Sequence, residues 1–249
     1  MLRPALSLLL LALAAPAALA APQTITSPAT RVSLLELYTS EGCSSCPPAE
    51  DWLGSLKDDD RLWKQVVPVA FHVDYWDYLG WRDPFDARTY TLRQQAIAAS
   101  AGNGTLYTPQ FVLDGKDWQN WFNHRPLSLD AGSKAGVLSL TAVGRAVHVR
   151  FFPATTDELR LTAYVTLLAF GVDVPVSAGE NNGVILRHDF LVVSYARMSL
   201  QRTSTGYVGD ITLSEPVTKA GRYALAGWVS SAGSPEPLQA AGGWLAAAP

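Results

Sequence analysis

An alternation of strand and helix signals in the first half of the chain constrains the fold most. Three short apolar runs are suited to buried strands, at residues 32–38, 66–73 and 108–115. Between the first two, Cys46–Asp51 begins a helix with two prolines and two acids in its first turn. Asp83-Pro84 opens a second helix that Gly102 closes, and its expected buried face carries Phe85, Leu92, Ala96 and Ala99. This order predicts an α/β unit with a central sheet.

The second half of the chain has the pattern of strands alone. Val147, Val149 and Phe151 alternate with more polar neighbours, and further strand candidates follow at residues 159–167, 190–198, 207–213 and 223–230. Several short strands separated by turns favour an all-β, sandwich-like domain. Asp130–Ser133 has the composition of a linker. We therefore expect an α/β N-terminal domain at 21–136 and a β-sandwich-like C-terminal domain at 137–249.

Residues 1–20 are typical of a secretory signal peptide. Arg3 precedes an apolar run at residues 5–13, and Ala18–Ala20 offers small residues at the positions that a signal peptidase recognises. A membrane anchor is the alternative, but the apolar segment is shorter than the roughly 20 residues that a span needs. We expect cleavage before Ala21, an exported protein that is periplasmic or secreted, and no stable membrane span after cleavage.

Composition excludes several classes of protein. With 48% hydrophobic and 16% charged residues, the chain is not disordered. Nineteen Lys and Arg residues against 22 Asp and Glu residues argue against a basic nucleic-acid-binding protein. Two cysteines are too few for a disulfide scaffold or a four-thiolate zinc site.

Those two cysteines, Cys43 and Cys46, lie where the first strand signal changes to a helix signal. A thiol just before a helix has its pKa lowered by unpaired N–H groups and by the helix dipole. We therefore predict that Cys43 is the attacking thiol and that Cys46, one turn inside the helix and more buried, resolves the mixed disulfide. Hydroxyls or amides of Ser44 and Ser45 are candidate donors to the Cys43 sulfur.

Other interpretations of the pair stay open. A structural disulfide is one, although so short a loop removes little entropy from the unfolded chain. A pair of thiols without present turnover is another. A zinc site would need two more ligands from among His72, His124, His148 and His188, and a copper site would join His72 to both cysteines; neither has supporting spacing.

Four segments together carry a family resemblance: Leu35–Glu50, Phe71–Asp77, Gly80–Phe85 and Tyr107–Val112. With these motifs the chain resembles the DUF1223 family, a group of exported bacterial proteins of the thioredoxin-like superfamily whose function is poorly established. The resemblance implies a thioredoxin-like N-terminal domain, with Cys43 and Cys46 as its redox pair. It also implies that Thr108-Pro109 is a cis-proline turn facing that pair.

The residues around Pro109 support a substrate-binding role for this turn. A proline at a strand start removes one ladder donor, which is tolerated there. A cis bond would leave backbone groups of Thr108 free to pair with an extended substrate, whereas the general expectation for such a bond is trans.

Three side chains are candidate proton relays. Glu36 lies on the strand before the motif, but strand alternation directs it to the face opposite Leu37, and a structural capping role is equally open. His72 and Asp74 share one face at the end of the second strand, ahead of an aromatic segment (Tyr75, Trp76, Tyr78, Trp81, Phe85). This segment is either a hydrophobic floor for a substrate or, as we favour, an aromatic core with a hydrogen-bonded histidine.

The sequence as a whole predicts an enzyme, an exported thiol–disulfide oxidoreductase that uses Cys43 and Cys46 for exchange with protein or small-molecule thiols and disulfides. It predicts no cofactor, no resident metal and no nucleic-acid partner. The alternative is a thioredoxin-fold binding module, for a protein partner or copper, without redox turnover.

Overall fold

A computed structural model describes residues 21–102, 104–130, 132–155 and 160–246. The expected signal peptide, residues 1–20, lies outside the described residues. Within the described ranges, no helix combines the length and the apolar character needed to cross a membrane.

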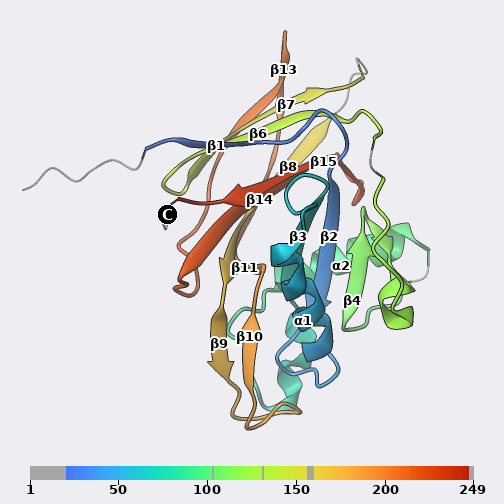
Figure 1. The fold of residues 1–249 in the computed structure, drawn as a ribbon, viewed down its shortest axis with the longest axis vertical. Coiled ribbons are helices and arrows are strands. Elements are labelled where there is room, and N and C mark those ends of the chain that lie inside the picture. The colour runs from blue at the N-terminus through green and yellow to red at the C-terminus, as the bar shows by residue number, and fades with distance from the viewer. Residues whose placement is uncertain (1–20, 103, 131, 156–159, 247–249) are drawn as a thin grey trace, which may run out of the picture.

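An eight-stranded mixed sheet forms the centre of the molecule (Figure 1). Strands β2 and β3 are parallel, β3 and β11 are also parallel, and the remaining neighbours are antiparallel. In spatial order the strands are β15 (Pro237–Trp244), β14 (Arg222–Ser231), β8 (Leu161–Phe170), β11 (Leu191–Ser199), β3 (Val66–His72), β2 (Ser33–Thr39), β4 (Gln110–Leu113) and β5 (Lys116–Asp117).

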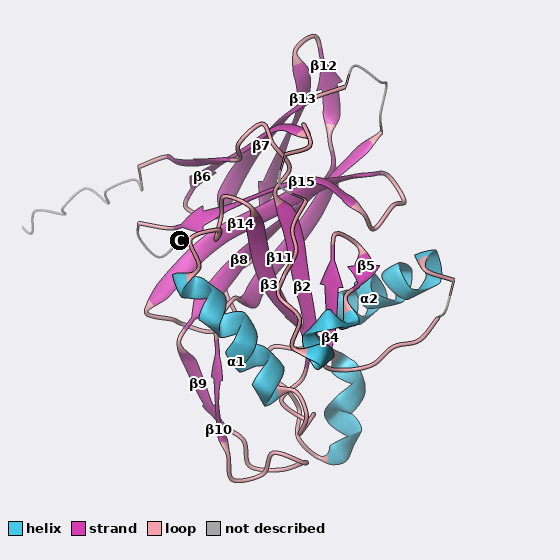
Figure 2. Ribbon diagram, turned by 45° about the vertical axis from the view of Figure 1, so that its right-hand side comes forward, coloured by secondary structure: helices cyan, strands magenta, loops and turns pink. Residues whose placement is uncertain are grey.

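A second sheet of five strands faces the antiparallel part of the first (Figure 2). Leu138, Leu140 and Phe151 of this sheet share one core cluster with Val165 and Leu225 of the eight-stranded sheet. Its strands in spatial order are β1 (Gln23–Thr26), β6 (Gly136–Val143), β7 (Ala146–Pro153), β13 (Gly206–Thr212) and β12 (Gln201–Thr203).

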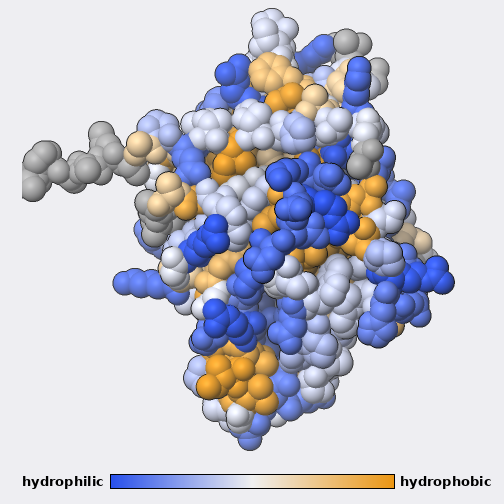
Figure 3. Space-filling view, viewed as in Figure 1, coloured by the Kyte–Doolittle hydropathy of each residue, from blue (hydrophilic) through white to orange (hydrophobic). Residues whose placement is uncertain are grey.

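Strands β9 (Val172–Pro175) and β10 (Ile185–His188) form a separate two-stranded hairpin, which projects toward the end of the molecule where α1 begins (Figure 1). Val184 and Ile185 of this hairpin are 45% and 69% exposed. The hydropathy surface has an apolar patch over the same hairpin (Figure 3).

Two α-helices cover opposite faces of β2. On one face, Thr39 hydrogen-bonds to Glu50 of α1 (Pro47–Ser55). On the other, Glu36 forms an ion pair with Arg93 of α2 (Arg88–Ser100). Short 3-10 helices complete the described elements: η1 (Leu56–Asp58), η2 (Asp74–Leu79) and η3 (Gln119–Asn123).

The central strands have the composition that burial on both faces requires. Every residue of β2 and of β3 is buried, in agreement with their near-continuous apolar runs. Pro68 lies within β3, where a missing N–H would ordinarily break a ladder. It is tolerated because the pairing of β3 with β11 is confined to Ala70 and Leu191, beyond the proline.

The expected fold class, an α/β thioredoxin-like N-terminal domain followed by an all-β, sandwich-like C-terminal domain, is wrong. The described chain is mostly β with three sheets, and strands from both halves belong to one sheet. Strand β11 pairs with β3, and β1 from the N-terminal region pairs with β6. Local pattern identifies strands, whereas the choice of pairing partner depends on contacts distant in sequence.

The second helix also differs from its expected form. It begins at Arg88 rather than at Asp83, although it ends as expected, with Gly102 in the left-handed region at φ 73°. Leu92 is 51% exposed, whereas Arg93 and Gln94 are buried. The polar residues face the core because buried partners accept from them there: Arg93 donates to Glu36, and Gln94 Nε2 donates to Gln110 Oε1 at 2.7 Å.

Candidate functional site

Cys43 and Cys46 form a disulfide at the start of α1, with their Cα atoms 5.5 Å apart. Cys46 is the residue immediately before the helix rather than one turn inside it, because Pro47 and Pro48 occupy the first helical positions. Both cysteines are fully buried, which corrects the expectation that Cys46 is the more buried of the two. Exchange chemistry at this disulfide therefore requires its cover to move.

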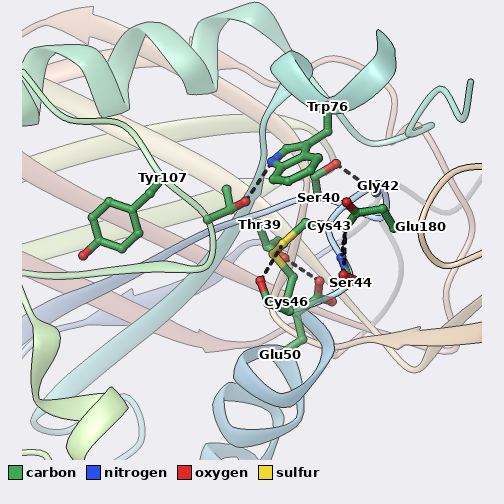
Figure 4. Close-up of a disulfide and its surroundings, with 12 residues drawn as sticks. Thr39, Ser40, Gly42, Cys43, Ser44, Cys46, Glu50, Trp76, Tyr107 and Glu180 are labelled. Carbon is green, nitrogen blue, oxygen red and sulfur yellow. Dashed lines mark hydrogen bonds between the residues drawn. A yellow bond between two sulfur atoms is a disulfide. The ribbon is translucent and has the colours of Figure 1, made fainter. Parts of the chain in front are cut away.

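One part of the cover is Trp76 of η2 (Figure 4). A Cβ on Gly42 would come within 3.0 Å of the Trp76 Cβ, so the residue before Cys43 has little room for a side chain. The Trp76 indole Nε1 donates to Thr108 Oγ1 at 2.8 Å. The Thr108-Pro109 peptide bond is cis, as the family resemblance implies. Trp76 thus connects the cysteine loop to the cis-proline turn.

A second part of the cover is the β9–β10 loop, residues 176–184, from the far half of the chain. Asn181 is buried, and its Nδ2 donates to the backbone oxygens of Glu41 (2.8 Å) and Cys43 (3.1 Å). Glu180 accepts hydrogen bonds from the Ser44 backbone N–H (3.0 Å) and hydroxyl (2.7 Å) (Figure 4). The loop is therefore attached to both sides of Cys43.

The two serines between the cysteines have different partners. Ser44 uses its amide and hydroxyl for Glu180, and these bonds lower the pKa of the Glu180 carboxyl. Ser45 Oγ lies 3.4 Å from Cys43 Sγ. Of the two candidate donors to the sulfur, Ser45 is the one in place.

A buried cluster of carboxylates and imidazoles lies next to the motif. Its members are Glu41, two residues before Cys43; Glu50, four residues after Cys46; and His72, Asp83 and His188. His188 donates from Nδ1 to Glu50 Oε2 (2.5 Å) and from Nε2 to Glu41 Oε1 (3.0 Å). The Nδ1 atom of His72 lies 2.7 Å from Asp83 Oδ2.

These contacts shift the pKa values of the cluster. Burial alone would lower the pKa of His188, but the charges of Glu50 and Glu41 and their hydrogen bonds raise it to about 10. Burial is likewise outweighed at His72, whose pKa is raised by Asp83. The pKa of Glu50 is lowered by His188 against the effect of burial. The raised pKa values of the two histidines favour their protonated forms, and the lowered pKa of Glu50 favours its carboxylate.

Glu36, a candidate relay, is not brought to the cysteines. It accepts hydrogen bonds from Arg93 Nε (2.5 Å) and Nη2 (2.8 Å) and from the Tyr38 hydroxyl (2.8 Å). Strand β2 pairs without a bulge, so Glu36 faces α2, while Thr39 faces α1.

Asp74, another candidate relay, accepts a hydrogen bond from Thr91 Oγ1 at 2.6 Å and joins η2 to α2. The aromatic residues that follow Asp74 differ in burial and in contacts. Phe85 is buried, Trp81 donates to Glu41 Oε2 at 2.7 Å, and Tyr78 is 79% exposed. His72 is a hydrogen-bonded core histidine, as favoured from the sequence.

Sequence reasoning missed His188, Asn181 and Glu180 as neighbours of the motif, because 138 residues separate His188 from Glu50. The position of Glu50 near the motif could have been predicted, because Glu50 follows Cys46 by four residues and so lies on the same helix face. Among the described residues, one group of three potential metal ligands has its ligand atoms all within 4.8 Å of one another: Glu50, His72 and His188. Neither cysteine belongs to this group; His148 pairs with Asp210 on β7 and β13.

Solved structures with a similar fold exist at low sequence identity. The structure of protein AGR_C_4864 from Agrobacterium tumefaciens matches with a TM-score of 0.55 and 22% identity, covering 86% of this chain and 94% of that one. HBP35 of Porphyromonas gingivalis matches with a TM-score of 0.61 and 14% identity, covering 89% of this chain and 77% of that one. These likenesses concern the fold alone.

Among curated proteins the chain has no match. A family model described as "Protein of unknown function (DUF1223)" matches residues 34–229. The match spans more than three quarters of the sequence and includes the cysteine motif, the cis-proline turn and most strands of the central sheet. The chain therefore belongs to the DUF1223 family.

Proposed function

We propose that this protein is an exported thiol–disulfide oxidoreductase whose Cys43 and Cys46 alternate between a disulfide and a dithiol. The observation that carries the proposal is the position of the disulfide. It lies at the N-terminal end of α1, linked through Trp76 to the cis Thr108-Pro109 turn and covered by a loop that hydrogen-bonds to the motif.

A purely structural role accounts less well for this arrangement. A disulfide across three residues closes too short a loop to restrict the unfolded chain strongly. Its two cysteines are also surrounded by serines, a tryptophan and a surface loop rather than joining distant elements.

In the proposed reaction, the thiolate of a substrate dithiol attacks Cys43 Sγ and the Cys43–Cys46 bond breaks. Cys46 leaves as a thiolate and takes a proton from solvent. The second thiolate of the substrate then attacks the substrate sulfur that is bonded to Cys43. The substrate disulfide forms, and Cys43 is released as a thiolate. The substrate loses two electrons to the protein; with a disulfide substrate the same steps run in reverse, Cys43 attacking and Cys46 resolving.

The β9–β10 loop controls access to the disulfide in this proposed reaction. Reaction at Cys43 requires an approach path to its sulfur, and the β9–β10 loop is bonded to the residues on either side of it. We propose that a substrate docks against the turn at Thr108 and Pro109 while this loop is displaced.

A redox titration of the pair tests the proposal. The purified protein is equilibrated in dithiol/disulfide buffers of graded potential, and its free thiols are alkylated and counted by mass spectrometry. We expect a potential well above about −300 mV, the range of labile couples. A potential far below that value would identify a structural bond and refute the proposal.

Two single variants test the order of attack. Cys46→Ser is expected to accumulate a mixed disulfide with an added disulfide substrate, because no resolving thiol is present. Cys43→Ser is expected to form none, and Ser204→Ala, in the exposed turn between β12 and β13, keeps both thiols and serves as the matched control. A normal exchange rate in Cys43→Ser would contradict the assigned roles.

Binding of a protein partner without turnover is a second candidate function. It is favoured by the exposed apolar residues Val184 and Ile185 on the hairpin that carries the covering loop (Figure 3). In that case the double variant Cys43→Ser/Cys46→Ser keeps full partner affinity, whereas Ile185→Asp weakens it.

A further inference from the structure

Three buried side chains that the sulfur chemistry does not use converge beside the cysteine motif. They are Glu50 on α1, His72 at the end of β3 and His188 at the end of β10. One ligand atom from each lies within 4.8 Å of those from the other two. The side chains are 8% exposed or less, so solvent does not compete for them.

His72 presents an unpartnered nitrogen in this cluster. Its Nδ1 is held by Asp83 at 2.7 Å, while its buried Nε2 has no hydrogen-bond partner. A buried polar atom left unsatisfied costs about 1–3 kcal/mol. Such an atom in a native site calls for an explanation, and an ion is one.

The surrounding carboxylates are arranged as supports for metal ligands. Ligating histidines usually donate their second ring N–H to a carboxylate, which fixes the ring. Here His72 has Asp83 on Nδ1, and His188 has Glu41 on Nε2. The remaining nitrogens, His72 Nε2 and His188 Nδ1, are left for the centre of the cluster.

The carboxylate in the group is supported in the same way. Glu50 Oε1 accepts a hydrogen bond from Thr39 Oγ1 at 2.6 Å, which leaves Oε2 directed at His188 Nδ1, 2.5 Å away. Ligating carboxylates are in turn hydrogen-bonded. Glu50, His72 and His188 are therefore each oriented by a hydrogen bond with a residue outside this group of three.

We propose that Glu50, His72 and His188 form a site for a divalent transition-metal ion of the zinc type. The ion takes the place of the proton between His188 Nδ1 and Glu50 Oε2 and of the proton on His72 Nε2, both of which are released to solvent. Two imidazoles and one carboxylate are ligands that Zn²⁺ accepts, with a fourth position open.

Charge and distance are compatible with this ion. Glu41, Glu50 and Asp83 place three carboxylates around two imidazoles, and a divalent cation compensates two of the three charges. Tetrahedral ligands about 2 Å from zinc lie about 3.3 Å apart, so movements of about 1 Å bring the three atoms to bonding distance.

Metal titration of the oxidised, full-chain protein tests the site. The protein is freed of metal with a chelator and titrated with Co²⁺ and then Zn²⁺, with the disulfide intact. We expect one equivalent of tightly bound ion, visible cobalt d–d bands, and no thiolate-to-cobalt charge-transfer band. Two exchangeable histidine N–H signals shifted by the cobalt would correspond to His72 Nδ1 and His188 Nε2.

Variants locate the ion. His72→Gln is expected to weaken Zn²⁺ binding by more than about 100-fold, and Thr39→Val, which keeps the side-chain volume, by about 10-fold. His148→Gln, at the exposed pair with Asp210, is the matched control and should bind as the parent does. If His72→Gln fails to fold, the Thr39→Val affinity and the cobalt spectrum decide.

Four results would overturn the proposal: no binding of one equivalent by the oxidised protein, full affinity in His72→Gln, a thiolate–cobalt band, or lost binding in Cys43→Ser/Cys46→Ser. Retained binding in that double variant supports the site. The double variant has no thiols and cannot carry out disulfide exchange, so its metal binding tests the metal site independently of the proposed redox function.

Discussion

Replacing Asn181 by alanine isolates the contribution of the β9–β10 loop to the protection of the disulfide. The buried amide of Asn181 donates to the carbonyl oxygens of Glu41 and Cys43. The variant Asn181→Ala removes both hydrogen bonds and leaves two carbonyls beneath the closed loop without these donors.

The size of the effect follows from these two bonds. Each is worth about 1 kcal/mol net, so the closed loop loses about 2 kcal/mol relative to the open one. Since 1.36 kcal/mol corresponds to a factor of ten, the population with an open loop rises about 30-fold. If opening of the loop exposes the sulfurs, the rate of reduction rises by the same factor.

The assay is the rate of disulfide reduction by excess dithiothreitol under native conditions, followed by alkylation of the released thiols and mass spectrometry. Asn182→Ala is the matched control, because Asn182 is an exposed neighbour in the same loop. Its reduction rate should stay close to that of the parent protein.

Two results would refute the reasoning. An unchanged reduction rate in Asn181→Ala would mean that the sulfurs are reached by another path. A rate that increases steeply with low concentrations of urea in both variants would mean that global unfolding, rather than the loop, exposes the disulfide.

Two further predictions concern charges away from the disulfide. Arg93→Met should lower the free energy of unfolding by about 3–5 kcal/mol in urea titrations, because it leaves the Glu36 carboxylate buried without its cation. A loss below about 1 kcal/mol would contradict this, and adding Glu36→Gln should restore most of the stability. Burial and the charges of Asp77 and Asp83 raise the pKa of Asp86 to about 6, so the stability that its protonated form contributes is lost as the pH rises from about 4 through 6. Asp86→Asn should therefore stabilise the protein at pH ~7.5 by about 1 kcal/mol, because solvent screening of a half-buried group reduces the effect of the full pKa shift. The same substitution should have no effect at pH ~4. An equal difference in melting temperature between variant and parent at both pH values would contradict this prediction.

Much of the local structure was predictable from the sequence. The apolar runs at residues 32–38 and 66–73 correspond to β2 and β3 within one residue at each end. The prolines after Cys46 mark the start of α1, and Gly102 marks the end of α2. These signals are local because prolines, glycines and unbroken apolar runs restrict the backbone at their own positions.

The buried face of α2 was not predictable in this way. Hydrophobicity alone favours burying Leu92, yet the helix buries Arg93 and Gln94. Their burial depends on Glu36 and Gln110, which lie on different strands. A polar residue is buried at low cost only where such partners exist, and no pattern within the helix reports them.

The features of the candidate site were likewise predictable only in part. Local signals in the chain were enough to locate Cys43 and Cys46 at a strand-to-helix junction and Thr108-Pro109 at the start of a strand, since both features depend on neighbouring residues. Three other features appear only in the folded chain: β11 continues the sheet beyond β3, Asn181 and Glu180 cover the cysteines, and His188 contacts Glu50. Strand pairing and side-chain contacts of this kind join residues more than 100 positions apart, so they are set by the packing of the whole chain rather than by any segment's own composition.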